Sequence, residues 1–152
     1  MARVPVIDPK TATGEAAELL NAVQAQLGIT PNFIRVLANS PKALSGFLGL
    51  YGAAAGFAVD KATQERIALA VAESNGCQYC VSAHTAIGRK AGLNNEEMAA
   101  NRAGGSHDAK AAVAVQFARA VIEHKGEVTN GEIQAMRDAG YTDSDIVEVI
   151  TH

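Results

Sequence analysis

Two cysteines and a histidine lie close together in the stretch NGCQYCVSAHTAIG, which spans residues 75–88. Two residues separate Cys77 from Cys80, and three separate Cys80 from His84. Because an α-helix turns by about 100° per residue, the three side chains would fall within an arc of about 60°. The spacing therefore predicts one stripe of a helix that carries two thiols and an imidazole, groups suited to redox or metal chemistry.

The order of these residues along the predicted helix has chemical consequences. Cys77 would lie in the first turn, where unpaired backbone N–H groups and the helix dipole stabilise an anion. The thiolate is the reactive form of cysteine, so this position favours reactivity. His84 would lie one turn beyond Cys80, where it can accept or relay a proton.

A carboxylate on the preceding segment is predicted to face this stripe. The dipeptide at residues 75–76, Asn-Gly, indicates a tight connection, so the helices on either side of it would form an antiparallel hairpin. Residues equally far from the turn then lie side by side, which puts His84 within a turn of Glu65. Glu65 shares an apolar stripe of its helix, whereas Glu73 does not and is expected in solvent. A carboxylate on an apolar face needs a partner, and the imidazole of His84 would supply it.

The residues alone leave several interpretations of this motif open. Buried cysteines can simply fill space in a helix with small side chains. Zinc is a second possibility, with Cys77, Cys80 and His84 as ligands and Glu65 as a fourth. General disulfide exchange is a third. A c-type haem site is excluded, because it would need a histidine directly after the second cysteine.

The rest of the chain reads as further helices with short connections. Pro31, Pro41 and Asp60 are placed to begin helices, and the pairs Thr129/Glu132 and Thr142/Asp145 have the spacing of capping boxes. No segment shows sustained period-two alternation, so no strand is predicted. The sequence therefore predicts one all-α domain over residues 1–152, a helical bundle with the Cys-x-x-Cys at the start of a core helix. The helical segments are expected at residues 13–28, 30–40, 41–58, 61–74, 77–92, 94–105, 107–126, 133–140 and 146–152.

Composition narrows the function classes. The net charge of −3 gives no basic surface for nucleic acid and no polybasic membrane anchor. The 16-residue run LSGFLGLYGAAAGFAV carries four glycines and is short for a membrane span, so it is expected to be a core helix. No signal peptide is visible and no nucleotide or flavin motif is present, so we expect a cytoplasmic protein without a bound cofactor. His107 and His124 are expected at helix ends, in structural or solvated positions.

The stretch QERIALAVAESNGCQYCVSAHTAIGRKAGL resembles the core of the alkylhydroperoxidase D-like group, part of the wider carboxymuconolactone decarboxylase family. The motif of that group is a Glu followed twelve residues later by Cys-x-x-Cys-x-x-x-His, and Glu65, Cys77, Cys80 and His84 match it. The segments GITPNFIRVLANSPKAL and VQFARAVIEHKGEVTNGEIQAMRDAGYTDSDIVEVI resemble the flanking regions.

The resemblance implies a helical bundle that assembles as trimers or hexamers, and thiol-dependent reduction of organic hydroperoxides or hydrogen peroxide. Cys80 would be the peroxidatic thiol, Cys77 the resolving thiol, and His84 with Glu65 the proton relay. An external dithiol or a protein disulfide reductant would supply electrons.

The sequence departs from this pattern in two places. Tyr79 stands where better-studied members often carry a second histidine, which indicates the peroxidase-related branch. The family usually continues past a point such as His152, so a further helix is expected there. A carboxymuconolactone decarboxylase-like enzyme, a general disulfide oxidoreductase and a zinc-holding helical oligomer remain the alternatives.

Overall fold

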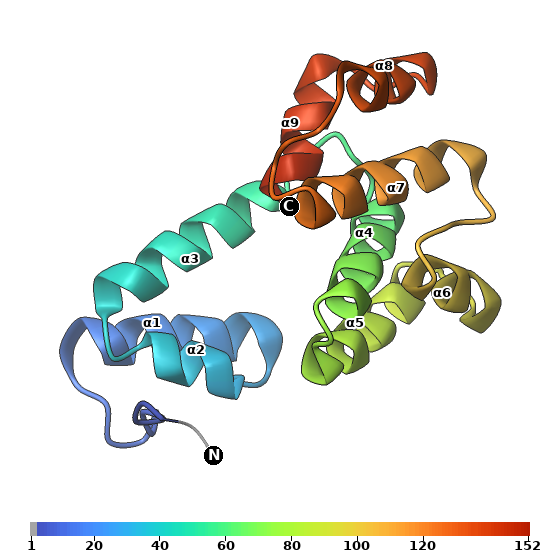
Figure 1. The fold of residues 1–152 in the computed structure, drawn as a ribbon. Coiled ribbons are helices and arrows are strands. Elements are labelled where there is room, and N and C mark those ends of the chain that lie inside the picture. The colour runs from blue at the N-terminus through green and yellow to red at the C-terminus, as the bar shows by residue number, and fades with distance from the viewer. Residues whose placement is uncertain (1–2) are drawn as a thin grey trace. The chain divides into compact units, whose positions relative to one another are not determined.

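The computed structural model describes residues 3–152, and this part of the chain is all helical, with no strand (Figure 1). The predicted fold class is therefore confirmed. The helices are α1 (Gly14–Leu27), α2 (Asn32–Leu37), α3 (Pro41–Ala54), α4 (Lys61–Ser74), α5 (Gln78–Lys90), α6 (Asn95–Arg102), α7 (Ala109–Glu123), α8 (Asn130–Asp138) and α9 (Asp143–Thr151).

These helices form two compact units, with α1 to α3 in the first and α4 to α9 in the second. The boundary falls after Gly56. The extent of the single domain predicted from the sequence stays a prediction. No helix within residues 3–152 is long and apolar enough to span a bilayer.

The first unit has a small apolar core to which all three of its helices contribute. Its fully or nearly fully buried members are Leu20, Val23, Ile34, Ala38 and Leu44. The aromatic ring of Phe47 contacts the rings of Phe33 and Tyr51 beside this core. The expectation of a core helix at residues 44–59 is wrong in two respects. The helix ends at Ala54, and Leu50 and Tyr51 are more than half exposed.

The second unit is built around α4, which contacts α5, α6 and α7 (Figure 1). A larger core joins α4 to α7, α8 and α9 through residues such as Ile67, Val115, Phe117 and Met136. A smaller one joins α4 to α6 through Leu69, Leu93 and Met98. Alanine supplies Ala70, Ala114 and Ala118 to the larger core, and these short side chains allow the helices to approach closely.

The capping residues predicted from the sequence are in place. Asp60 accepts a hydrogen bond from the backbone N–H of Thr63 at the start of α4. The capping boxes at Thr129 and Thr142 are complete, with both reciprocal hydrogen bonds present. Because each satisfies backbone groups that would otherwise lack partners, these caps fix where α4, α8 and α9 begin.

Candidate redox site

Cys77 and Cys80 lie at the start of α5 and are joined in a disulfide. Cys77 is the N-cap residue, and its Sγ accepts a hydrogen bond of 3.2 Å from the backbone N–H of Cys80. The sequence produces this arrangement because Gly76, with φ of 64°, reverses the chain directly before the cysteine. Both sulfurs are thus held within the first turn of one helix, where the helix dipole favours negative charge.

His84 and Glu65 form a close pair between α5 and α4. The distance from His84 Nδ1 to Glu65 Oε2 is 2.8 Å. Glu65 is only 9% exposed, and the side chain of His84 is 30% exposed. The predicted hairpin therefore places the inward-facing carboxylate against the imidazole, while Glu73 lies near the surface in an ion pair with Arg102.

The hydrogen bond between His84 and Glu65 determines which ring nitrogen of His84 can exchange a proton with another group. A carboxylate only accepts hydrogen bonds, so Nδ1 of His84 carries the hydrogen and donates it to Glu65. Nε2 is then the ring nitrogen left to exchange a proton with another group. Because His84 lies four residues after Cys80 in α5, the two side chains are neighbours on the surface of the helix.

A glycine allows α5 to lie close against α4 near this pair. Gly88 is buried, one turn beyond His84. A Cβ atom at this position would lie 3.3 Å from Leu93, 3.4 Å from Met98 and 3.9 Å from the Cβ of Glu65. The missing side chain thus leaves room for Leu93 and Met98 to pack against α5, beside the contact of α5 with α4.

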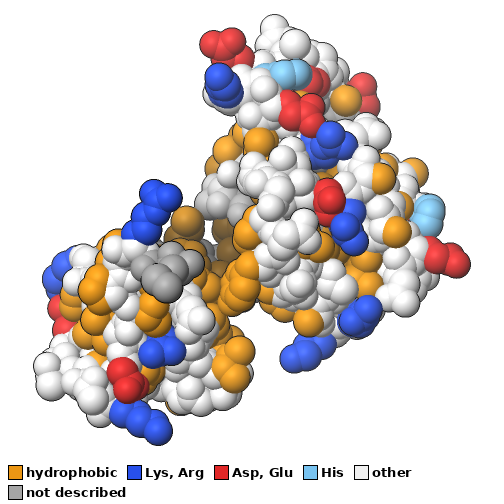
Figure 2. Space-filling model, turned by 60° about the horizontal axis from the view of Figure 1, so that its bottom comes forward, with side chains coloured by type: hydrophobic (Ala, Val, Ile, Leu, Met, Phe, Trp, Pro, Cys, Tyr) orange, Lys and Arg blue, Asp and Glu red, His pale blue; other side chains and the backbone are white. Residues whose placement is uncertain are grey.

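Apolar side chains reach the surface beside the cysteines. Tyr79, between the two cysteines, is 59% exposed, and Ile87, seven residues after Cys80, is 39% exposed. Elsewhere Val147 and Ile150 of α9 are also more than half exposed. Figure 2 shows hydrophobic side chains at the surface of both units, interspersed with charged ones.

A second buried polar cluster was not foreseen from the sequence. Glu97 of α6 accepts hydrogen bonds from Arg66 (2.7 Å), Asn101 (2.9 Å) and the backbone N–H of His107 (2.9 Å). Burial by itself would raise the pKa of Glu97, but its hydrogen bonds, those from Ser106 and Asn101 foremost, outweigh burial and lower the pKa to about 2. Glu97 lies in the first turn of α6, and no local pattern in the sequence signals its burial.

This cluster is structural rather than catalytic. It ties α4 and α6 to the connection before α7, and Asn101 within it is fully buried. His107 is 67% exposed in its side chain, and His124 caps the end of α7, so both histidines lie at helix ends as expected.

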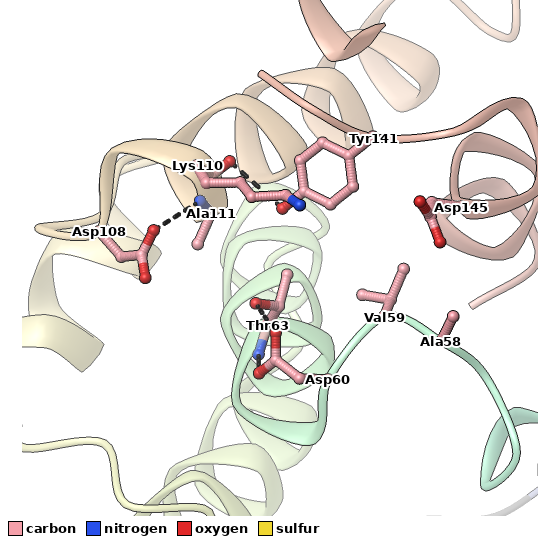
Figure 3. A pocket seen from close by; sticks show the side chains of 9 residues that line it. All are labelled: Ala58, Val59, Asp60, Thr63, Asp108, Lys110, Ala111, Tyr141 and Asp145. Atoms are coloured by element: carbon pink, nitrogen blue, oxygen red, sulfur yellow. Dashed lines mark hydrogen bonds between the residues drawn. The ribbon is translucent and has the colours of Figure 1, made fainter.

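A pocket lies elsewhere in the second unit, where α4, α7 and α9 begin (Figure 3). Lys110 Nζ lies 4.6 Å from the centre of the Tyr141 ring and donates to the carbonyl of Gly140. Burial, followed by the nearby carboxylates, raises the pKa of Tyr141 to about 12. The carboxylates of Asp60, Asp108 and Asp145 all accept hydrogen bonds from backbone N–H groups at helix starts, so this pocket is a junction of helix ends.

Among the described residues, no group of three or more His, Cys, Asp or Glu side chains is arranged to hold a metal ion. The structure thus brings together the four residues predicted for the site as two pairs, Cys77 with Cys80 and Glu65 with His84. Their chemical roles stay predictions.

Comparison with known proteins places this geometry in context. The model of the carboxymuconolactone decarboxylase family matches residues 41–124, more than half of the chain and all four residues of the site. No curated protein gives a significant match in sequence.

Several solved structures share the fold, including the following three. A peroxidase-related protein from Silicibacter sp. TM1040 superposes with a TM-score of 0.84 at 23% identity, over 99% of this chain and 80% of that protein. The alkylhydroperoxidase AhpD core of a peroxidase-related protein from Ralstonia eutropha JMP134 superposes with a TM-score of 0.83 at 27% identity. The match covers 98% of this chain and 81% of that protein. The debrominase Bmp8, in complex with 2,3,4-tribromopyrrole, superposes with a TM-score of 0.81 at 18% identity. The match covers 99% of this chain and 82% of that protein.

Proposed function

This chain belongs to the carboxymuconolactone decarboxylase family, and on that premise we propose that it is a thiol-dependent peroxidase that reduces organic hydroperoxides or hydrogen peroxide. One observation carries the proposal. The disulfide-bonded pair Cys77 and Cys80 begins the same helix whose next turn presents His84 on the carboxylate of Glu65. A thiol pair, a proton carrier and an orienting carboxylate are the groups that peroxide reduction requires.

In the first step Cys80, reduced and deprotonated, attacks one oxygen of the peroxide. A bond forms between sulfur and that oxygen while the O–O bond breaks, so the peroxide gains two electrons and Cys80 becomes a sulfenic acid. His84 takes the proton of the Cys80 thiol through Nε2 and passes it to the leaving alkoxide or hydroxide. Glu65 holds the ring in the required tautomer and stabilises its positive form.

In the second step Cys77 attacks the sulfenic sulfur of Cys80. The disulfide forms and water leaves, as expected for two cysteines held within one helical turn. An external dithiol or a protein disulfide reductant then restores both thiols by thiol–disulfide exchange. The electrons thus pass from that reductant to the peroxide.

The position of Cys77 supports different chemical roles for the two thiols. As the N-cap residue it lies at the end of the helix where negative charge is favoured, and so it is the better leaving group when an external thiol attacks the disulfide. Cys80 lies one turn nearer to His84, which supports its assignment to the peroxide. Tyr79, which replaces a histidine common in the group, is not needed for either step.

A homo-oligomer is part of the proposal. The α3 helix is apolar along its length, yet Leu50 and Tyr51 are exposed, and Val147 and Ile150 are exposed on α9. Exposed apolar side chains on helices of both units are typical of chains that bury them against further copies.

The deciding experiment counts thiols. The reduced protein is treated with cumene hydroperoxide or hydrogen peroxide, and we expect two thiols per chain to be lost and then recovered with dithiothreitol. The double variant Cys77→Ser/Cys80→Ser is the control and should not consume peroxide. Thiols that survive excess peroxide would contradict the proposal. Insulin reduction without peroxide turnover would instead favour a disulfide oxidoreductase, and an activity that survives alkylation of both thiols would favour a decarboxylase.

A further inference from the structure

A second histidine reaches the helix that carries Glu65. His152 follows α9, and its Nε2 lies 3.0 Å from the carbonyl oxygen of Gln64. A carbonyl oxygen only accepts, so Nε2 of His152 carries the hydrogen and donates it. Gln64 is the residue before Glu65, so this ring is anchored one residue away from the carboxylate that holds His84.

The position of His152 is set by a well-held helix. α9 begins with the complete capping box at Thr142, and Ile146 and Val149 are buried in the larger core. The carboxylate of Glu148 accepts a hydrogen bond of 3.1 Å from the backbone N–H of Val59, just before α4. α9 is therefore fastened to the start of α4 by a side-chain contact in addition to the one from His152.

The charge on His152 is coupled to both members of the pair. Although His152 is an exposed residue as a whole, its ring lies against α4, and desolvation lowers its pKa. The hydrogen bond to Gln64 and the charge of Glu65 act to raise this pKa, and the charges of His84 and Lys61 act to lower it. The pKa of His152 thus lies below that of an ordinary histidine.

The other charged groups near α9 lie at its opposite end. Asp108 and Lys110 of α7 line the pocket with Asp145, in the first turn of α9. Arg137 of α8 pairs with Asp143 at the same end. The groups that act on the His152 ring therefore come mainly from α4 and α5.

We infer that His152 is a positioning residue of the redox site, a second imidazole held next to the helix position of Glu65, whose protonation acts on the pair of Glu65 and His84. The inference rests on the proposed function for its chemical meaning. When His152 takes up a proton, its positive charge lies near this pair, and a second positive charge on His84 is disfavoured. His84 would then stay available to receive the proton of Cys80 at a lower pH than it could alone.

The first test does not depend on activity. The pKa of His152 is measured by NMR on the full chain with labelled histidines, in the wild type and in Glu65→Gln, His84→Gln and His124→Gln. We expect the proton affinity of His152 to fall about fivefold in Glu65→Gln, the lower end of the range typical of coupling between sites, and to rise in His84→Gln. His124→Gln is the matched control, since His124 also follows the last residue of a helix and lies 3.7 Å from a glutamate, Glu132. A pKa of His152 that is the same in all four proteins overturns the inference.

The second test uses peroxide turnover with dithiothreitol as the reductant. In His152→Gln, which keeps a donor for the Gln64 carbonyl but cannot titrate, the ratio of the rate at pH 5.5 to that at pH 8 should fall about fivefold. His124→Gln should keep the wild-type ratio. An active wild type with an unchanged ratio in His152→Gln overturns the inference and leaves the peroxidase proposal standing. A wild type without peroxide turnover refutes that proposal instead, and the NMR measurement still decides whether His152 is coupled to Glu65.

Discussion

The carboxylate of Glu65 holds the Nδ1 atom of His84 at 2.8 Å across the contact between two helices, although the two residues are 19 positions apart. Glu65 is nearly buried, so its charge is directed onto the imidazole rather than into solvent. The hydrogen bond leaves Nε2 of His84 as the ring nitrogen that can exchange a proton with another group.

Removing the charge of Glu65 should slow peroxide reduction without unfolding the protein. In Glu65→Gln the amide still reaches His84, but it neither fixes the tautomer nor stabilises the positive ring. We expect kcat/KM for peroxide to fall about 100-fold, the lower end of the range for a lost proton relay. Glu73→Gln is the control, because Glu73 lies on the same helix in a surface ion pair with Arg102. Equal rates in the two variants would remove Glu65 from the mechanism.

Single cysteine variants should separate the two thiols. Cys77→Ser should form a sulfenic acid with one equivalent of peroxide and keep it, because the resolving thiol is gone. Cys80→Ser should form none. The measurement is trapping with dimedone followed by mass spectrometry. Our assignment fails if the trapped adduct appears in Cys80→Ser, since Cys77 would then be the peroxidatic residue.

A larger side chain at Gly88 should weaken catalysis without touching any reacting group. Its Cβ would lie 3.3 Å from Leu93 and 3.4 Å from Met98, so the branched side chain of Gly88→Val displaces these two side chains and disturbs the packing of α5 against α6 and α4. We expect a loss of about tenfold or more in kcat/KM, because a displacement of about 1 Å can cost up to 100-fold. Ser82→Val, at an exposed position of the same helix, is the control for helix propensity. Similar rates in the two valine variants would contradict this role of Gly88.

The buried cluster around Glu97 should make stability depend on acid pH. Its pKa is lowered from 4.5 to about 2, so the carboxylate stabilises the fold fully above about pH 4.5 and loses this contribution as pH falls towards 2. Glu97→Gln should cost about 3 kcal/mol at pH 7, because Arg66 and the other donors then face an uncharged amide. Urea unfolding at pH 7 and pH 3 measures the free energy in both proteins.

The gap in unfolding free energy between the wild type and Glu97→Gln should shrink at pH 3, where part of the wild-type advantage is already gone. Glu96→Gln, at an exposed neighbouring position, is the control and should differ from the wild type by less than about 0.5 kcal/mol. A gap that is constant with pH would show that Glu97 does not carry this stabilisation.

The sequence by itself determined the features that depend on neighbours along the chain. The caps at Asp60, Thr129 and Thr142 and the turn at Gly76 follow from local hydrogen bonds and backbone conformation, and the structure has them where the residues predict. The opposition of Glu65 and His84 was also within reach, because a short hairpin fixes the register of its two helices.

Only the tertiary structure decided the contacts between segments that are distant in the sequence. Arg66 meets Glu97 across 31 positions, and His152 meets Gln64 across 88. Such contacts depend on how several helices pack together, and no periodicity within one segment encodes that. The same reason explains why the composition of α3 predicts a buried helix, whereas Leu50 and Tyr51 are exposed in the structure. An apolar stripe indicates that one face of a helix packs against other apolar surface. Whether that surface comes from the same chain depends on how all the helices pack.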